Sequence, residues 1–183
     1  MLYAFAAPSG TGKTTIVKEI LKRNPEIEFS ISATTRKKRD IETDGKDYYF
    51  LSMEEFEDKI RKEDFIEYEK IFDGNYYGTL KSAVQDAIVR GKSMLFDIDV
   101  LGALSIKKHF KENSVLIFVK PPSKEEIMTR LINRKTETKQ QIERRLSRFD
   151  IEMAKINEFD YIVLNDNLES AVNKVQEIIN KTI

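Results

Sequence analysis

The residues best suited to chemistry lie near the N-terminus, in the segment Ala7-Pro8-Ser9-Gly10-Thr11-Gly12-Lys13-Thr14. The apolar run Leu2–Ala6 precedes it and a helical pattern follows, so we expect a strand, a glycine-rich turn and a helix. Backbone N–H groups of such a turn point inward and surround phosphate oxygens, and the helix N-terminus adds a favourable field. Lys13 is spaced to reach the β- and γ-phosphates of a nucleoside triphosphate, and Thr14 to ligate Mg²⁺. The segment therefore predicts a triphosphate-binding loop.

The loop departs from the usual pattern at its first position, where Ala7 replaces the common glycine. The alternative is an ordinary glycine turn that caps the helix expected over residues 14–23. Gly-Lys-Thr after an N-terminal strand is more specific than an isolated glycine motif, so we favour the phosphate-binding loop. Ala7 is compatible with that loop on the condition that its backbone needs no positive φ.

A pair of aspartates follows the apolar run Ser93-Met94-Leu95-Phe96. Asp97 ends this predicted strand, at the carboxyl edge of the sheet and beside the expected loop. An isolated aspartate at a strand end is more often a helix N-cap. Because phosphate-loop proteins use such an aspartate to hold Mg²⁺, the upstream loop favours the metal role for Asp97. For Asp99, two residues further on, two roles stay open: a residue of the site, or the N-cap of the helix that begins at Val100.

A local cationic cluster, Ser-Ala-Thr-Thr-Arg-Lys-Lys-Arg, occupies residues 32–39. Arg36 and Arg39 are suited to bidentate phosphate binding, because the guanidinium fork matches phosphate oxygens. A solvated basic loop or a nucleic-acid patch is the alternative. A patch for a polymer needs reinforcement across the surface, which a formal net charge of zero does not promise. We interpret the cluster as a second phosphate site.

The composition limits the class of protein. With 183 residues the chain is long enough for one well-buried core. Charged residues make up 34% of it at zero net charge, so we expect no nucleic-acid or membrane partner and a locally built anion site. There are no cysteines, which excludes disulfides and thiolate metal sites. No apolar run approaches membrane-spanning length. We expect a soluble, cytoplasmic protein.

Apolar runs and amphipathic patterns alternate along the chain. The strands are expected at residues 2–6, 29–31, 93–98, 115–120 and 161–164, and the helices at 14–23, 80–90, 100–109, 124–133, 142–156 and 168–181. This alternation predicts an α/β fold, a parallel sheet with helices on both faces. Residues 47–77 break the rhythm, because short aromatic-rich pieces flank a small helix at 53–61. They predict a mixed or antiparallel insertion.

In this order, the motifs resemble those of the guanylate kinase family across essentially the whole chain. The matching residues are 32–39 (with Thr-Thr-Arg-x-x-Arg), 45–48 (Gly-Lys-Asp-Tyr), 65–67 (Phe-Ile-Glu), 74–79 (Gly-Asn-Tyr-Tyr-Gly-Thr), 97–99 (Asp-Ile-Asp), 136–138 (Thr-Glu-Thr) and 165–166 (Asn-Asp). The resemblance implies transfer of the γ-phosphate of ATP to GMP, with dGMP as a slower acceptor and Mg²⁺ as cofactor. It implies a single domain over residues 1–183, with a P-loop NTPase-type core at about 1–31, 80–123 and 158–183, a GMP-binding region at about 32–79 and a helical lid at about 124–157.

The resemblance also implies a role for individual residues. ATP would be bound by Ser9, Gly10, Thr11, Gly12, Lys13, Thr14, Thr15, Asn165 and Asp166, and the metal by Thr14 and Asp97. The GMP phosphate would be held by Arg36, Arg39, Tyr48 and Tyr77, and guanine by Ser32, Glu67, Thr79 and Asp99. The transferring group would meet the catalytic residues Lys13, Arg39, Arg134 and Arg145. Taken singly, the lid arginines suit an ordinary exposed helix, and Asn165-Asp166 a turn that caps the last helix.

Two departures and two other functions stay open. Lys38 stands where proline is common, and the stretch from Glu67 to Gly74 is one residue longer than usual, which affects the placement of Glu67. A non-catalytic module of this family that binds phosphopeptides is one alternative. Such modules typically lose the loop lysine or the lid arginines, whereas this chain keeps Lys13, Arg134 and Arg145. A kinase of another nucleoside monophosphate is the second. Monomer and homodimer are both open.

Overall fold

The computed structural model describes residues 1–70, 74–133 and 139–182; within them the side chains of residues 130, 131, 133, 139–141, 144 and 145 are not described. A five-stranded parallel sheet forms the centre, in the order β2-β7-β1-β8-β9. Its strands are β1 (Leu2–Ala6), β2 (Glu28–Phe29), β7 (Met94–Asp97), β8 (Ser114–Lys120) and β9 (Tyr161–Leu164). Every residue of β1 is buried, as expected for a central strand with both faces covered.

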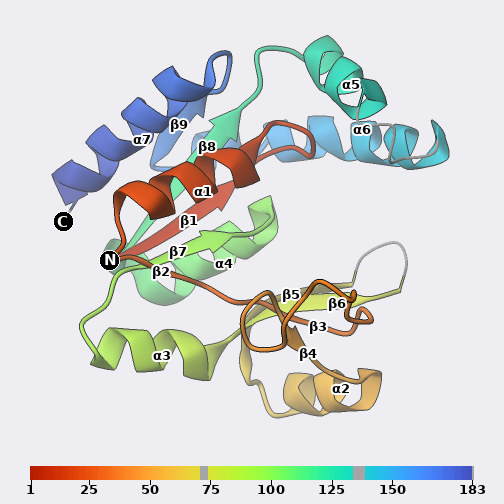
Figure 1. Ribbon diagram of the computed structural model, residues 1–183, viewed down its shortest axis with the longest axis vertical. Helices are drawn as coiled ribbons and strands as arrows, with labels where there is room; N and C mark the ends of the chain where they lie inside the picture. The colour runs from red at the N-terminus through yellow and green to blue at the C-terminus, as the bar shows by residue number, and fades with distance from the viewer. Residues whose placement is uncertain (71–73, 134–138, 183) are drawn as a thin grey trace.

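Alternate residues of β1 enter two separate cores. Tyr3 and Phe5 pack with α1 (Lys13–Arg23) and α7 (Leu168–Thr182), whereas Leu2, Ala4 and Ala6 pack with α3 (Lys81–Val89) and α4 (Val100–Phe110). Successive side chains of a strand point to opposite faces, so helices cover both sides of the sheet. Figure 1 shows the same layering. The predicted α/β class with a helix-covered parallel sheet is confirmed.

A second, smaller sheet has the order β4-β3-β6-β5. Its strands are β3 (Ala33–Thr34), β4 (Tyr49–Phe50), β5 (Phe65–Lys70) and β6 (Tyr76–Leu80). β3 is parallel to β4, while β3 and β5 are both antiparallel to β6, so the insertion is a mixed sheet as predicted. Helix α2 (Met53–Arg61) covers it, and the Phe56 ring stacks on Phe65 at 4.3 Å and on Tyr76 at 5.1 Å.

Two further helices, α5 (Lys124–Asn133) and α6 (Lys139–Met153), pack through Ile127 and Phe149. In Figure 1, this pair and the second sheet both lie toward the edge of the central sheet at which β1 ends, the pair above it and the second sheet below it. Short 3₁₀ helices lie at η1 (Lys111–Asn113) and η2 (Ile156–Glu158). In the described parts of the chain, no helix combines the length and the apolar character needed to cross a bilayer.

Two predicted elements differ from the structure by two or more residues at a boundary, several others differ by one residue, and one short strand was not predicted. The strand expected at 29–31 is β2, Glu28–Phe29; its register with β7 covers these two residues, and the bonding ends with the Ser30 N–H, which donates to the Leu95 carbonyl. The helix expected at 142–156 is α6, Lys139–Met153, followed by η2. Its first turn is polar but made of good helix formers, so hydrophobic periodicity does not reveal it. Strand β3 lies inside the predicted cationic loop, because main-chain bonds from Tyr49 and Leu51 to Ser32 and Thr34 hold it in the sheet.

Candidate active site

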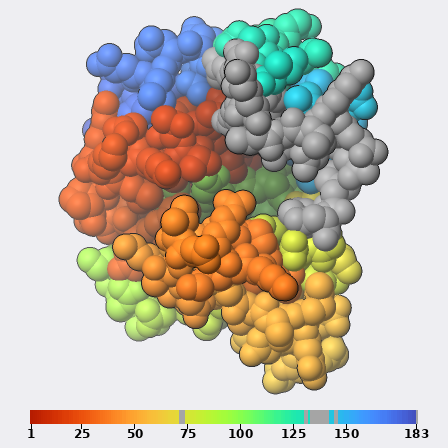
Figure 2. Space-filling model, turned by 45° about the vertical axis from the view of Figure 1, so that its right-hand side comes forward, coloured from red at the N-terminus to blue at the C-terminus, as the bar shows by residue number. Residues whose placement is uncertain are grey.

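A cavity of about 440 Å³ lies at the carboxyl ends of β1 and β7. Its lining comes from the loop after β1, from Asp97, Ile98 and Asp99, from β5 and β6, from Ser32 and Tyr48, and from Arg148 and Glu152 of α6. Figure 2 shows a recess between the red N-terminal residues and the orange segment, with green residues at its floor. The carboxyl edge of a parallel sheet is the usual ligand position in such folds.

The loop after β1 has the backbone shape of a phosphate cradle. Gly10 has φ 89° and Gly12 has φ 95°, and Gly12 is the N-cap of α1. The Thr11 side chain is buried and donates a hydrogen bond to the Pro8 carbonyl at 2.6 Å, so it stabilises the turn from inside. Among the described non-glycine residues, positive φ is found at Glu63 and Lys111 and not at Ala7. The condition under which Ala7 suits the loop is therefore met.

Asn165 supports the loop from behind. Its side chain is 7% exposed, and its Nδ2 donates to the Thr11 carbonyl at 2.6 Å. A Cβ added to Gly12 would lie 2.8 Å from that same nitrogen, so the two groups are in tight contact. Asp166 is exposed and accepts a bond from the Asn167 N–H at 2.7 Å, while Asn167 caps α7 through the Ser170 N–H. Thus Asn165 contacts the loop backbone, and Asp166 lies in the turn before α7.

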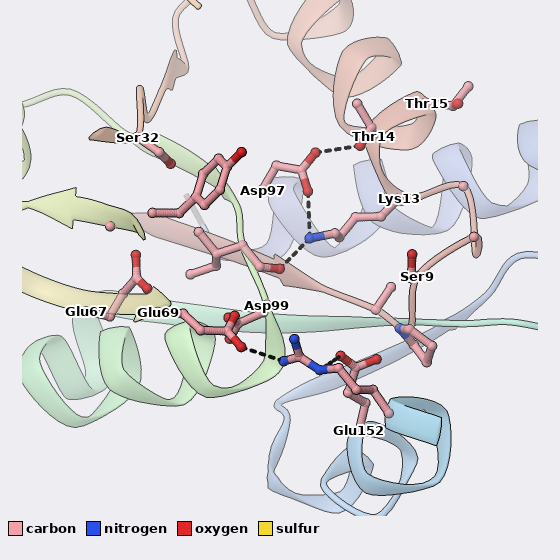
Figure 3. Close-up of a pocket in the computed structure, with 18 of the residues that line it drawn as sticks. Ser9, Lys13, Thr14, Thr15, Ser32, Glu67, Glu69, Asp97, Asp99 and Glu152 are labelled. Atoms are coloured by element: carbon pink, nitrogen blue, oxygen red, sulfur yellow. Dashed lines mark hydrogen bonds and ion pairs between the residues drawn. The ribbon is translucent and has the colours of Figure 1, made fainter. Parts of the chain in front are cut away.

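Asp97 connects the loop lysine with the threonine that follows it (Figure 3). Lys13 Nζ lies 2.6 Å from Asp97 Oδ1, and it also donates to the carbonyls of Phe5 and Ile98. Thr14 Oγ1 donates to Asp97 Oδ2 at 2.8 Å. Mg²⁺ prefers oxygen ligands and commonly takes only one or two from protein, the rest from water and phosphates. A hydroxyl and a carboxylate oxygen 2.8 Å apart, beside the phosphate cradle, fit that requirement.

At another part of the cavity, the half-buried carboxylate of Glu67 lines the wall, and the buried hydroxyl of Thr79 lies behind it. Thr79 is 1% exposed and donates to Glu67 Oε1 at 2.6 Å, across the β5–β6 ladder. Burial raises the pKa of Glu67 to about 7, although the Thr79 hydrogen bond acts in the opposite direction. Removing a carboxylate from water disfavours its charged form, so this group is poised to receive hydrogen-bond donors from a ligand.

Three carboxyl groups, those of Glu69, Asp99 and Glu152, lie around the Arg148 guanidinium nearby. Asp99 caps α4 by accepting the Gly102 N–H at 2.7 Å, and it is hydrogen-bonded to Glu69. Burial opposes its ionisation, but the bonds from Glu69 and the Gly102 N–H lower the pKa of Asp99 overall. Burial raises the pKa of Glu69 and of Glu152 to about 7 each. Arg148 lies 2.8 Å from Glu69.

Arg36 is held in place by Glu42 and by aromatic rings. Its guanidinium makes two bonds to Glu42, at 2.7 and 3.0 Å, and lies 5.3 Å from the Tyr48 ring centroid. The hydrogen bonds to Glu42 raise the pKa of Arg36, and those from Arg36 lower the pKa of Glu42 to about 2. Tyr48 packs edge-on against Tyr77 at 5.9 Å. Burial raises the pKa of Tyr48.

The cavity brings together many of the residues proposed for ATP, GMP and metal. Those that line it are Ser9, Gly10, Gly12, Lys13, Thr14, Thr15, Ser32, Tyr48, Glu67, Tyr77, Asp97 and Asp99. Those described but outside its lining are Thr11, Arg36, Arg39, Thr79, Asn165 and Asp166. Of these, Arg36 and Thr79 touch the lining residues Tyr48 and Glu67. Arg39 is exposed, and its main-chain N–H donates to Glu42. Arg134 lies outside the described residues, as does the side chain of Arg145.

Sequence reasoning did not assign Glu42, Glu69, Arg148 or Glu152. Glu69 follows Glu67 by two residues on one strand, a period that places both on the same face, so alternation could have found it. Arg148 and Glu152 are spaced i, i+4 on a predicted helix, which signals a pair. Glu42 had a weaker signal, since an acidic residue six positions after Arg36 is commonplace.

The fold and the loop define the class first. A parallel sheet whose first strand runs into a glycine-rich turn, a lysine and a helix is the architecture of P-loop nucleotide-binding proteins. A second sheet and a helix pair flank that loop, as in a kinase with a separate acceptor site.

Comparison with known proteins identifies the family. The family model "Guanylate kinase" matches residues 2–182. A guanylate kinase of Chlorobaculum tepidum is 49% identical over 174 residues, 95% of this chain and 89% of the relative. One of Clostridium tetani is 46% identical over 180 residues, 98% of this chain and 85% of the relative. The crystal structure of guanylate kinase from Anaplasma phagocytophilum superposes with a TM-score of 0.77 at 30% identity, covering 99% of this chain and 85% of that one. The chain belongs to the guanylate kinase family.

Proposed function

We propose that this protein transfers the γ-phosphate of ATP to GMP, and more slowly to dGMP, giving ADP and the nucleoside diphosphate. The observation that carries the proposal is one cavity lined both by the Lys13 loop and by Glu67, whose carboxylate accepts a hydrogen bond from Thr79. Its family and its relatives support the same activity. A triphosphate at the loop and a base at Glu67 would share one enclosed space.

The acceptor base is selected by hydrogen-bond complementarity. Guanine carries N1–H and N2–H donors beside its O6 acceptor, which suits the carboxylates of Glu67 and Asp99 and the hydroxyl of Ser32. Adenine has neither an N1 proton nor a 2-amino group, so it would leave a buried carboxylate without a partner. A site of this kind discriminates by roughly 10⁴-fold. This chemistry favours GMP over other monophosphates.

Phosphoryl transfer requires alignment of two anions and neutralisation of the moving group more than it requires a base. We assign Lys13 to the β- and γ-phosphates, and Arg39, Arg134 and Arg145 to the transferring group. Arg36, Tyr48 and Tyr77 would receive the GMP phosphate; the Arg36 guanidinium already lies on the Tyr48 ring. Ser9, Gly10, Gly12 and Thr15 would surround ATP through the loop, with Asn165 supporting it.

Mg²⁺ is the cofactor that this donor set suits. Thr14 and Asp97 would hold it, the carboxylate directly or through water. When bound, the ion neutralises charge on the phosphate oxygens of ATP. Asp97 contacts both Lys13 and Thr14, so one carboxylate orients the two loop residues assigned to the phosphates and to the ion.

We assign the three parts of the chain to three tasks. The second sheet with α2, at about residues 32–79, would bind GMP, and the α5–α6 pair, at about 124–157, would act as a lid. The remaining residues form the P-loop core. A closing lid would exclude water, which otherwise accepts the phosphoryl group. Because both substrates are free intracellular nucleotides, we place the activity in the cytoplasm.

A coupled assay of ADP release tests the proposal with ATP, Mg²⁺ and each of GMP, dGMP, AMP, CMP and UMP. We expect turnover with GMP, slower turnover with dGMP and little with the others. Faster turnover with AMP or UMP would contradict the guanine site. No turnover with any acceptor would favour a phosphopeptide-binding module. Lys13→Ala is the control: it should lose at least about 10²-fold in turnover while still binding GMP, because it removes a charge that acts on ATP.

A further inference from the structure

An ion pair joins the second sheet to helix α6. Arg148 Nη2 on α6 lies 2.8 Å from Glu69 Oε1 on β5, and the two side chains are 30% and 29% exposed. The same guanidinium lies 3.6 Å, through Nε, from Glu152 Oε1 one turn further along α6. Thus a residue of the proposed lid contacts a residue of the proposed acceptor region directly.

Glu69 lies next to the part of the cavity proposed to bind the base. It follows Glu67 by two residues on β5, so both side chains leave the same face of the strand. Its carboxyl group is hydrogen-bonded to Asp99, and Glu67, Glu69 and Asp99 all line the cavity. Figure 3 shows the Glu69 and Asp99 side chains next to each other, with Glu67 to one side of them and Glu152 to the other. A ligand that contacts Glu67 and Asp99 therefore adjoins Glu69.

The charge balance makes Arg148 important to this cluster. Besides Asp97, which pairs with Lys13, four carboxyl groups line the cavity: those of Glu67, Glu69, Asp99 and Glu152. Glu152 Oε2 is buried and, among the described atoms, has no hydrogen-bond partner. Loss of Arg148 would leave several half-buried carboxylates close together, which is costly in a region of low dielectric. The guanidinium therefore holds α6 and the cluster in one arrangement.

We propose that Glu69 and Arg148 form a latch, an ion pair that couples the binding of GMP at β5 to the position of helix α6. The proposal rests on the proposed function. Arg148 is a positioning residue in it, because the pair is not assigned to the reacting atoms. Arg145, proposed for the transferring phosphoryl group, lies three residues before Arg148 on the same helix. Fixing Arg148 therefore fixes the turn of α6 that carries Arg145.

The structure provides a matched control on the same helix. Lys124 of α5 forms an ion pair of 2.6 Å with Asp150 of α6, and neither residue lines the cavity. Lys124→Gln thus removes one positive charge and one ion pair from the α5–α6 pair without touching the second sheet. Any effect shared by Lys124→Gln and Arg148→Gln reflects general loosening of the helix pair.

The test compares Glu69→Gln, Arg148→Gln, the double variant, Arg148→Lys and Lys124→Gln with the unmodified protein. Two measurements are made on each: KM and kcat for GMP, and hydrogen exchange of α6 amides with and without GMP. In the unmodified protein, GMP should slow exchange in α6. Far-UV circular dichroism and thermal melting establish that each variant is folded.

We expect Glu69→Gln and Arg148→Gln each to raise the KM for GMP by about threefold to tenfold, the scale of a partly buried ion pair. The KM effect should exceed any change in kcat, and the GMP-dependent protection of α6 should disappear. The double variant should resemble either single one, because each removes the same interaction. Arg148→Lys should raise the KM for GMP less than Arg148→Gln does, because it keeps the positive charge. Lys124→Gln should resemble the unmodified protein.

The latch would be overturned by GMP-dependent protection of α6 that persists in both single variants, or by effects of Lys124→Gln equal to those of Arg148→Gln. Additive effects of Glu69→Gln and Arg148→Gln would also contradict it, because independent sites add. Failure of the unmodified protein to phosphorylate GMP would instead overturn the proposed function. The latch alone fails when the unmodified protein is active and its α6 helix responds to GMP, but Glu69→Gln and Arg148→Gln behave like the unmodified protein.

Discussion

Gly12 shows how closely a single residue is constrained in the phosphate loop. It combines a left-handed backbone, with φ 95°, and a neighbour that leaves no space for a Cβ, since Asn165 Nδ2 would lie 2.8 Å away. Asn165 cannot retreat easily, because it is buried and bonded to the Thr11 carbonyl. The chain therefore needs glycine here for two independent reasons.

For Gly12→Ala we expect a raised KM for ATP and a loss of stability beyond the roughly 1 kcal/mol that a left-handed alanine costs. Gly91→Ala is the matched control, because Gly91 also has positive φ, 67°, but has nothing within 4 Å of an added Cβ. Gly91→Ala should lose only the stability that a left-handed alanine costs, and its KM for ATP should be unchanged. Steady-state kinetics and urea unfolding measure both quantities. Equal behaviour of the two variants would refute the contact with Asn165.

At the level of elements, the second sheet has a small core of its own. Phe56 of α2 is fully buried between Phe65 and Tyr76, and this cluster is separate from the two cores of the central sheet. A capping box holds the start of α2: Glu55 N–H donates to Ser52 Oγ at 3.1 Å, and Ser52 N–H to Glu55 Oε2 at 2.7 Å. The acceptor region can therefore loosen while the P-loop core stays intact.

We expect Phe56→Ala to destabilise this region by about 3–5 kcal/mol, the usual cost of truncating a buried phenylalanine. Hydrogen exchange should accelerate in β5 and β6 but not in α1 or α7, and the KM for GMP should rise more than that for ATP. Phe29→Ala, at a side chain 40% exposed, is the control and should change little. Uniform acceleration across the whole chain would show that the two parts unfold as one unit.

At the scale of the whole molecule, the net charge is zero, but the acidic groups of the cavity are concentrated on one side of it. Lys13, paired with Asp97, and the helix N-terminus lie at the phosphate loop, while Glu67, Glu69, Asp99 and Glu152 outnumber Arg148 toward β5 and α6. The raised pKa values of Glu67 and Glu152, about 7 against the ordinary 4.5, show that burial of these groups favours their protonated form. They therefore make the stability of the unliganded protein depend on pH.

The direction follows from linkage. A carboxyl group whose pKa is higher in the folded state contributes stability that is present below 4.5 and is lost as the pH rises to about 7. We therefore expect a higher melting temperature at about pH 5.5 than at about pH 8 for the protein without nucleotide. Calorimetry measures the difference.

The double variant Glu67→Gln/Glu152→Gln should reduce this difference, since glutamine does not titrate. Glu177→Gln is the control: Glu177 is exposed, and the hydrogen bond to Lys174 lowers its pKa, so the slope above pH 4.5 should persist. A melting temperature that rises between about pH 5.5 and pH 8 would contradict the assigned burial of Glu67 and Glu152.

The amino-acid sequence determined the elements that depend on neighbouring residues. The predicted bounds of β1, β9, α2 and α5 agree with the structure residue for residue. Hydrophobic periodicity and helix capping depend on residues only a few positions apart, so they can be read from the sequence. The phosphate-loop motif and the mixed character of the insertion follow from the same local signals. The order of the motifs along the chain was also sufficient to indicate the family, which comparison then confirmed.

Only the tertiary structure decided which distant groups meet. Asn165 supports a loop 154 residues earlier, and strand β3 exists because β4 and β6 supply its hydrogen-bond partners. Arg148 meets Glu69 only after β5 and α6 have folded on either side of the cavity. The raised pKa values of Glu67 and Glu152 likewise arise from burial. Burial and long-range contact depend on how the sheets and helices enclose a space, and no local pattern of residues encodes that enclosure.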